Sequence, residues 1–229
     1  MPTARAVTRR AALATGAAAV GAALLRPWRL RAAAAADRKI LYVQPLGDEL
    51  PAADAALVAT AIEGVIGWEV RTLERMALPA DAFYKPRRRW RADKLLDVLD
   101  GQLPRGGARI LGLTGADIST TKGDVFDWGV LGLGRIDGAS SVISLFRCRK
   151  GARAAAHARE RLAKVAVHEV GHTLGLDHCP NRGCLMEDAE GRVATCDREY
   201  DFCARCRNLL ADAGRPLPAP PTIPWRRPS

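Results

Sequence analysis

The chain has 229 residues, of which 48% are apolar, so it is long enough for one domain with a sizeable core and terminal extensions. Its net charge of +10 first suggests a nucleic acid or an anionic membrane as partner. Residues 1–36, however, hold six arginines and no acidic residue, and without them 29 basic residues face 25 acidic ones, a net charge of +4. We therefore expect no nucleic-acid partner.

Residues 1–36 have the features of an export signal. Arg9 and Arg10 precede an uncharged run at 11–25, and an alanine tract at 32–36 offers a cleavage site of the A-x-A type. The run is short for a membrane span and weakly hydrophobic, which is typical of a twin-arginine signal. We expect a periplasmic or extracellular protein without a stable membrane span after cleavage. An uncleaved anchor and a disordered tail are the alternatives.

The segments that follow alternate between strand-like and helical patterns. Short apolar runs with β-branched residues predict strands, and apolar residues three and four positions apart predict helices. We expect strands at 39–44, 68–73, 109–113, 127–133 and 140–146, and helices at 51–66, 92–99, 152–174 and 201–211. This alternation predicts an α/β (α+β) fold. The proline-rich tail at 212–229 is expected to be disordered.

The longest expected helix carries a motif with a specific chemistry. The sequence from His168 to His178 reads H-E-x-x-H-x-x-G-x-x-H and holds three of the chain's four histidines. His168 and His172 are four residues apart, so on a helix they share one face and can bind one zinc ion. Gly175 allows the left-handed turn that ends a helix, so that His178 can approach the metal from another side.

Three neutral imidazoles leave a fourth coordination position on zinc for water, which is typical of a catalytic site. Glu169 follows the first histidine and is not needed as a ligand. It can act as the general base that accepts a proton from the zinc-activated water. The motif therefore predicts a zinc hydrolase.

Four cysteines behind the motif form a second cluster. Cys179 and Cys184 are separated by four residues, Cys203 and Cys206 by two, and the two pairs by eighteen. This spacing is close to that of a zinc ribbon, in which four thiolates close a structural site. The alternative is two disulfides, which are common in exported proteins.

With both clusters assembled, the chain resembles the archaemetzincin family of zinc peptidases. The family pattern is H-E-x-x-H-x-x-G-x-x-H-C, then C-x-M after four residues, then a distal C-x-x-C. The matching positions are His168, Glu169, His172, Gly175, His178, Cys179, Cys184, Met186, Cys203 and Cys206. The resemblance extends over residues 38–211, and its paired motif is highly specific.

The resemblance implies a metzincin-like fold over residues 37–211, with a mixed twisted sheet, backing and active-site helices, and a small zinc-stabilised C-terminal subdomain. The N-terminal subdomain would span 37–178 and the Cys-rich one 179–211. The resemblance also implies two zinc ions per chain, one catalytic and one structural. The substrate would be a peptide or protein, with aminopeptidase-like action on short peptides, and we expect a monomer.

Two further roles follow from the resemblance. Met186 would belong to a Met-turn, an apolar floor beneath the three histidines. Ser140, Val142 and Ser144 would lie on the edge strand that pairs with extended substrate through backbone hydrogen bonds. An ordinary sheet strand is the alternative.

Some questions stay open at this stage. Cys148 and Cys196 fall outside the family pattern and are either free buried thiols or a disulfide with each other. Asp127, Glu187 and Asp188 are candidates for an acid that binds a substrate's amino group, or else solvated surface carboxylates. The other hypotheses for the whole chain are a non-catalytic zinc-stabilised binding module and a nucleic-acid-binding zinc ribbon.

Overall fold

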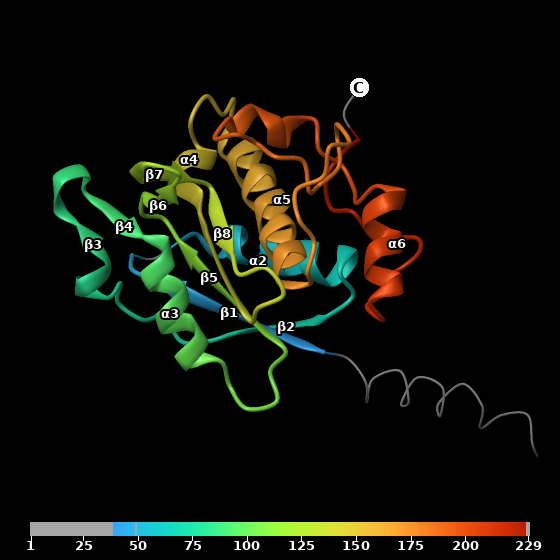
Figure 1. Ribbon diagram of the computed structural model, residues 1–229, viewed down its shortest axis with the longest axis horizontal. Helices are drawn as coiled ribbons and strands as arrows, with labels where there is room; N and C mark the ends of the chain where they lie inside the picture. Colours follow the sequence, from blue (N-terminus) through green and yellow to red (C-terminus); the bar gives the residue numbers. More distant parts are fainter. Residues whose placement is uncertain (1–38, 49, 228–229) are drawn as a thin grey trace, which may run out of the picture. The chain divides into compact units, whose positions relative to one another are not determined.

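The computed structural model describes residues 39–48 and 50–227 (Figure 1). The expected export signal at 1–36 lies outside these residues. The strands are β1 (Ile40–Leu46), β2 (Glu69–Thr72), β3 (Phe83–Tyr84), β4 (Arg89–Arg91), β5 (Arg109–Thr114), β6 (Ile118–Lys122), β7 (Val125–Val130), β8 (Gly132–Gly134) and β9 (Ser140–Ser144). The helices are α2 (Ala52–Val65), α3 (Ala92–Gln102), α4 (Leu145–Cys148), α5 (Ala155–Thr173) and α6 (Ala204–Asp212), with short 3-10 turns at Ala80–Ala82, Lys85–Arg87 and Val193–Asp197.

The central sheet has the strand order β2-β1-β5-β9-β8. Its strands run parallel except β8, which pairs antiparallel with β9. Parallel strands are normally covered by helices on both faces. Here α2 and α5 cover one face and α3 covers the other, as Figure 1 shows. The predicted α/β architecture with a mixed sheet is therefore confirmed.

Each helix is fixed by an apolar stripe at helical spacing. In α2, Val58, Ile62 and Val65 are fully buried against β1 and α5. In α3, Leu95 and Leu99 fill the opposite core. Burying such a side chain stabilises the fold by about 1.5–3 kcal/mol, so these stripes hold both helices on the sheet. The core thus lies in two layers, one on each side of the sheet.

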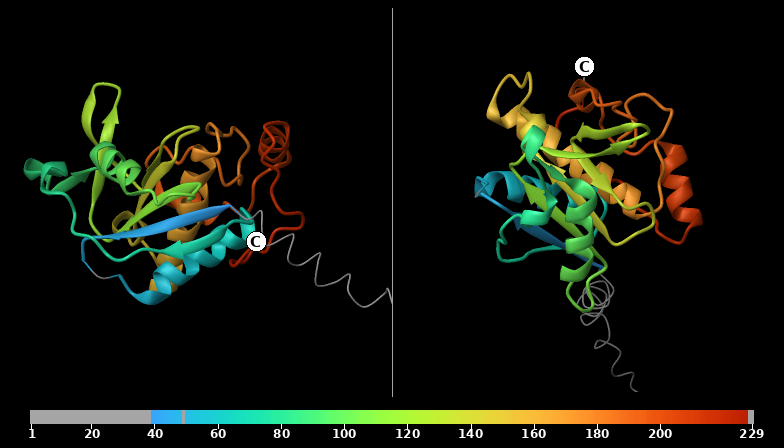
Figure 2. Two further views of the ribbon diagram at one scale, coloured as in Figure 1. Left: turned by 90° about the horizontal axis from the view of Figure 1, so that it is seen from below. Right: turned by 60° about the vertical axis from the view of Figure 1, so that its left-hand side comes forward.

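A second, smaller sheet was not expected from the sequence. Its strand order is β3-β4-β6-β7, and Figure 2 shows the β6–β7 hairpin projecting beyond the central sheet. These strands are short and mostly not buried: Arg91 of β4 and Ile118 and Ser119 of β6 are their buried residues. Ion pairs from Arg89 to Asp117 and Asp127 tie the small sheet together. Sequence periodicity misses such strands because side chains distant in the sequence hold them.

The edge strand of the central sheet differs from the one expected. Ser140, Val142 and Ser144 lie on β9, which is paired on both sides and buried throughout. The prediction that they form the substrate-binding edge is therefore wrong. The open edge belongs to β8, which comes from the glycine-broken segment expected at 127–133 and pairs Leu133 with Val142.

The C-terminal tail is packed rather than disordered. Thr222 N–H donates to Gly64 O at 2.9 Å, and Trp225 is 7% exposed, with its Nε1–H donating to Tyr200 O at 3.0 Å. Arg207 Nη1 donates to Pro218 O. Proline-rich composition does not reveal this packing, in which apolar tail residues bury enough surface to offset the cost of ordering. No helix in the described part of the chain is long and apolar enough to cross a membrane.

Candidate active site

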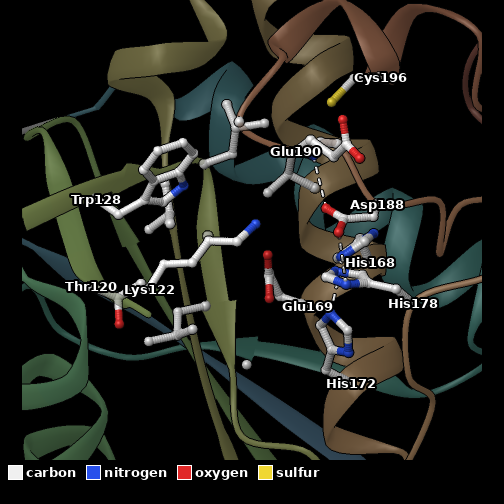
Figure 3. A pocket seen from close by; sticks show the side chains of 18 of the residues that line it. Thr120, Lys122, Trp128, His168, Glu169, His172, His178, Asp188, Glu190 and Cys196 are labelled. Carbon is white, nitrogen blue, oxygen red and sulfur yellow. Dashed lines mark hydrogen bonds and ion pairs between the residues drawn. The ribbon is translucent and has the colours of Figure 1, made fainter. Parts of the chain in front are cut away.

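Helix α5 presents the first two histidines to one point in space. The rings of His168 and His172, one turn apart, have centroids 4.7 Å apart, and their Nε2 atoms are separated by 3.0 Å. The ring of His178 lies 5.4 Å from the first and 4.9 Å from the second. Figure 3 shows the three imidazoles converging. The structure thus brings together all three histidines of the motif.

Backbone carbonyls orient two of these rings. His168 Nδ1 donates to Leu185 O at 2.6 Å, and His172 Nδ1 donates to Leu176 O at 2.7 Å. Each Nε2 is therefore the unprotonated nitrogen. Burial lowers the pKa of His168 to about 3 and also lowers that of His172, so both rings are neutral. Two nitrogen lone pairs at this separation repel unless a cation lies between them, so this donor set fits a zinc ion.

The third histidine reaches the site through a turn. Gly175 has a φ of +91°, in the left-handed region that favours glycine, and its N–H donates to His172 O to end the helix. His178 follows with a half-exposed side chain, and its Nδ1 lies 3.5 Å from Asp188 Oδ2. The third histidine thus comes from a loop and depends on neighbouring segments for its position.

Glu169 faces the same space as the histidines and is almost fully buried, at 6% exposure. Burial raises the pKa of its carboxyl to about 8. Strand β8 can approach Glu169 closely because Gly132 and Gly134 have no side chains. A Cβ on Gly132 would lie 2.6 Å from Glu169 Oε1, and one on Gly134 would lie 2.6 Å from the Glu169 carbonyl oxygen.

Met186, the residue expected in a Met-turn, packs against α5 at Gly171, which lies between His168 and His172 in the sequence. It is fully buried, and a Cβ on Gly171 would lie 2.5 Å from its Sδ, so α5 needs a glycine at that point. Its carbonyl accepts a hydrogen bond of 2.7 Å from Cys179 N, while the preceding Leu185 holds His168. This turn therefore links the histidine site to the cysteines.

The four cysteines form a second, closed group. The Sγ atoms of Cys179 and Cys203 are 3.6 Å apart, and those of Cys184 and Cys206 are 3.7 Å apart. These distances exceed the length of a disulfide bond, about 2.05 Å. They agree with the edge of a ZnS₄ tetrahedron, about 3.8 Å for Zn–S bonds of about 2.3 Å. The geometry therefore suits a zinc ion better than two disulfides, which were the alternative considered from the sequence.

Cys148 and Cys196 are free and buried, so they are not joined in a disulfide, which was the other alternative. Burial raises the pKa of Cys148 to about 12 and that of Cys196 well above its ordinary value, so neither thiol is ionised at neutral pH. Cys148 Sγ lies 3.4 Å from Ser144 O. Both side chains are part of the core, and Cys196 also borders the cavity described next.

A cavity of about 340 Å³ opens in front of the histidines. One wall is formed by β8 and by the β6–β7 hairpin, which contributes Lys122 and Trp128 (Figure 3). The other wall is formed by α5 and by the segment after Met186, which contributes Asp188 and Glu199. Lys122, Trp128 and Glu199 could not be assigned to this site from sequence, because they lie far from the motif along the chain.

Two of the three candidate amine-binding acids are used elsewhere. Asp127 Oδ2 pairs with Arg89 at 2.7 Å, and Glu187 pairs with Arg198 and accepts a hydrogen bond from Gly183 N. Both side chains are largely buried, so they are not solvated surface carboxylates either. Asp188 alone of the three lines the cavity.

Comparisons with known proteins agree with this geometry. Residues 71–212 match the family model described as "Peptidase family M54". A relative named Archaemetzincin from Haloarcula marismortui is 31% identical over 179 residues, covering 73% of this chain and 98% of that protein. Another from Methanopyrus kandleri is 36% identical over 137 residues, covering 60% of this chain and 74% of that protein.

Two solved structures have the same fold. The crystal structure of archaemetzincin from Methanopyrus kandleri superposes with a TM-score of 0.66 at 31% identity, covering 76% of this chain and 94% of that one. That of archaemetzincin from Archaeoglobus fulgidus, complexed with malonate, gives a TM-score of 0.62 at 30% identity, covering 74% and 98%. The chain therefore belongs to peptidase family M54, the archaemetzincins, and is a zinc-dependent metallopeptidase.

Proposed function

We propose that this metallopeptidase hydrolyses peptide bonds with Glu169 as general base, beside a catalytic zinc held by His168, His172 and His178. One observation carries the proposal: the buried Glu169 carboxyl faces the same cavity as the unprotonated Nε2 atoms of the α5 histidines. A carboxyl with a raised pKa is suited to accept and return a proton near neutral pH.

Glu169 and strand β8 have separate roles in the proposed reaction. When bound, zinc supplies a Lewis acid that lowers the pKa of a water molecule to about 7. Glu169 accepts the proton of the attacking water at a carboxylate oxygen and then returns it to the nitrogen of the leaving amine. The glycines of β8 hold Glu169 away from bulk water. A cation beside the carboxylate lowers the pKa of Glu169 and keeps it ionised before the reaction.

The substrate is proposed to bind along β8. Within its sheet this strand is paired only with β9, so its other edge faces the cavity, where Gly134 already donates a backbone hydrogen bond to the Glu169 carboxylate. An extended peptide can add to such an edge antiparallel, with its backbone hydrogen bonds giving affinity and its side chains entering pockets. This places the role first assigned to β9 on the neighbouring strand.

Aminopeptidase-like action on short peptides is the finer part of the proposal. It requires a carboxylate that receives the free amino group, and Asp188 is the one candidate of the three that borders the cavity. Its half-exposed side chain also faces His178. Peptides with free amino ends would then be cleaved faster than their acetylated forms.

A second zinc, structural in role, is proposed for Cys179, Cys184, Cys203 and Cys206. Their mutual distances and the closed surroundings support it: three of the four thiols are buried. We further propose that the twin-arginine sequence at 1–36 exports the folded chain, which then acts as a monomer in the periplasm or outside the cell. Replacing Arg9 and Arg10 with lysine should retain the protein in the cytoplasm, as measured by cell fractionation.

The direct test is cleavage of a peptide library by zinc-loaded protein, with products identified by mass spectrometry. We expect cleavage that a hydroxamate and a chelator both abolish, and that re-added zinc restores. Each short peptide is tested with a free and with an acetylated amino end. Complete absence of cleavage by protein with full zinc content would instead favour a non-catalytic binding module.

A further inference from the structure

The inner end of the cavity is formed by buried side chains that the proposed chemistry does not use. Val165, Cys196 and Glu199 all line it, with exposures of 4%, 2% and 2%. Its outer part is formed by exposed residues such as Ile136 and Glu190. The cavity therefore leads from solvent, past the histidines, to a buried carboxyl.

The Glu199 carboxyl is buried without a hydrogen-bond donor for one of its oxygens. Its Oε2 is buried and has no partner among the described residues. The nearest cations are engaged elsewhere. Lys164 Nζ pairs with Glu160 at 2.8 Å and donates to Cys196 O at 3.0 Å, and Arg198 pairs with Glu187. Burial raises the pKa of Glu199 to about 8, and the charges of Lys164 and Arg198, which lower it, do not offset this effect. A buried polar group of this kind is costly unless a ligand satisfies it.

The direction of the substrate follows from β8 and α5. Gly132 approaches the Glu169 side chain, whereas Gly134 approaches the Glu169 carbonyl and His172, so β8 and α5 run in the same direction. A peptide antiparallel to β8 therefore points its C-terminal part toward the end of α5 that carries Val165. The inner end of the cavity then receives the side chain of the residue that follows the cleaved bond.

We propose that Glu199 selects peptides in which the residue after the cleaved bond is lysine or arginine. The aliphatic stem of that side chain lies along Val165 and the neighbouring apolar wall, and its charged head pairs with the Glu199 carboxylate. Lys122, the cation on the opposite wall, has its Nζ 5.5 Å from the centre of the Trp128 ring and lines the same cavity. This specificity rests on the proposed peptidase function and on the binding of substrate along β8.

The test uses zinc-loaded full chain and peptides that differ only at the residue after the cleaved bond. That residue is arginine, lysine, norleucine, glutamine or glutamate, norleucine being an uncharged match for lysine in length. We expect kcat/KM for arginine and lysine to exceed that for norleucine by about tenfold to a hundredfold, as for a hydrogen bond to a charged group. Glu199→Gln should bring this ratio close to one. Glu190→Gln, which neutralises an exposed carboxylate at the mouth, should preserve it.

A binding measurement separates this proposal from the peptidase function. Calorimetry with arginyl-alanine amide and norleucyl-alanine amide, on the zinc-loaded Glu169→Ala variant, needs no turnover. Tighter binding of the arginyl compound, lost on adding Glu199→Gln, supports the role of Glu199 even if no peptide is cleaved. Equal binding and equal cleavage of the basic and norleucine compounds by the unsubstituted cavity would overturn it. A preference for glutamine or glutamate, or a preference for arginine that survives Glu199→Gln, would overturn it as well.

Discussion

The histidine site and the cysteine site are joined at consecutive residues, His178 and Cys179, yet their surroundings differ. The histidines open onto a cavity, whereas the cysteines are enclosed by core residues. The protein thus has a solvent-accessible group of histidines next to an enclosed group of cysteines. The closed site can hold the loop that carries His178, which α5 alone does not position.

Removing the carboxylate of Glu169, the proposed general base, should have the largest effect on catalysis and leave the cysteine site unchanged. We expect Glu169→Ala to lower kcat by about 10²–10⁴-fold, because proton transfer is lost, while zinc content stays unchanged. The measurement is peptide cleavage together with metal analysis. Glu63→Ala, at an exposed carboxylate of α2 that does not line the cavity, is the matched control and should keep its activity. Turnover by Glu169→Ala at the rate of the unsubstituted enzyme would refute the assignment.

Cysteine substitutions test whether the two sites are coupled. Cys184→Ser and Cys179→Ser should each lose the structural zinc and lower the melting temperature, because metal binding contributes to folding. Cys179→Ser should also weaken catalytic zinc affinity by about tenfold to a hundredfold, as expected when a group that orients a ligand is lost. Competition with a chelator measures this affinity. An unaltered catalytic affinity in Cys179→Ser would count against coupling through the turn.

Glycine substitutions test how closely β8 must approach the open site. Gly132→Ala would place a methyl group 2.6 Å from Glu169 Oε1 and so displace the carboxylate. We expect kcat/KM to fall by about tenfold to a hundredfold, because misplacement of about 1 Å has this size of effect. Gly101→Ala is the control: its Cβ meets nothing within 4 Å in α3, and it should stabilise the fold by about 0.5–1 kcal/mol. Full activity of Gly132→Ala would show that the strand has room to move.

The smallest predicted effect concerns the segment behind both sites. Asp197 accepts hydrogen bonds of 2.7 Å from Arg161 Nε and Nη2, and these lower its pKa to about 2 from an ordinary 3.8. A depressed carboxyl pKa adds stability above about pH 4, and that stability is lost as the pH falls toward 2. Asp197→Asn should therefore cost about 2 kcal/mol at neutral pH, because Arg161 is left without its partner.

Urea denaturation at several pH values checks this prediction. The difference in unfolding free energy between the parent chain and Asp197→Asn should shrink between pH 4 and pH 2. Glu190→Gln removes an exposed pair with Arg192 and should change stability by less than about 0.5 kcal/mol at any pH. A difference for Asp197→Asn that stays constant down to pH 2 would contradict the assigned pKa.

The parts of the molecule that were predictable are those in which local sequence decides the geometry. Helix α5 was expected at 152–174 and spans Ala155–Thr173, and its histidine spacing placed two ligands on one face. Gly175 was expected to form a left-handed turn and does so. Ligands within eleven residues can be assigned from spacing alone, because the helix and the turn determine where they go.

The parts that were missed depend on long-range pairing. A buried strand and an edge strand differ by which partners they find, so Ser140–Ser144 could not be distinguished from an edge by its own residues. The tail was expected to be disordered because composition does not reveal that Trp225 docks near Tyr200. Glu199 was overlooked for the same reason: it lies thirty residues after Glu169, and only folding brings both to one cavity.

The zinc content of purified protein lacking residues 1–36 directly tests whether the chain holds one catalytic and one structural zinc. We predict two zinc ions per chain, with His168→Ala losing one and keeping the fold, and Cys184→Ser losing the other. One zinc per chain that His168→Ala removes completely, together with a cysteine cluster that binds no metal, would contradict this prediction.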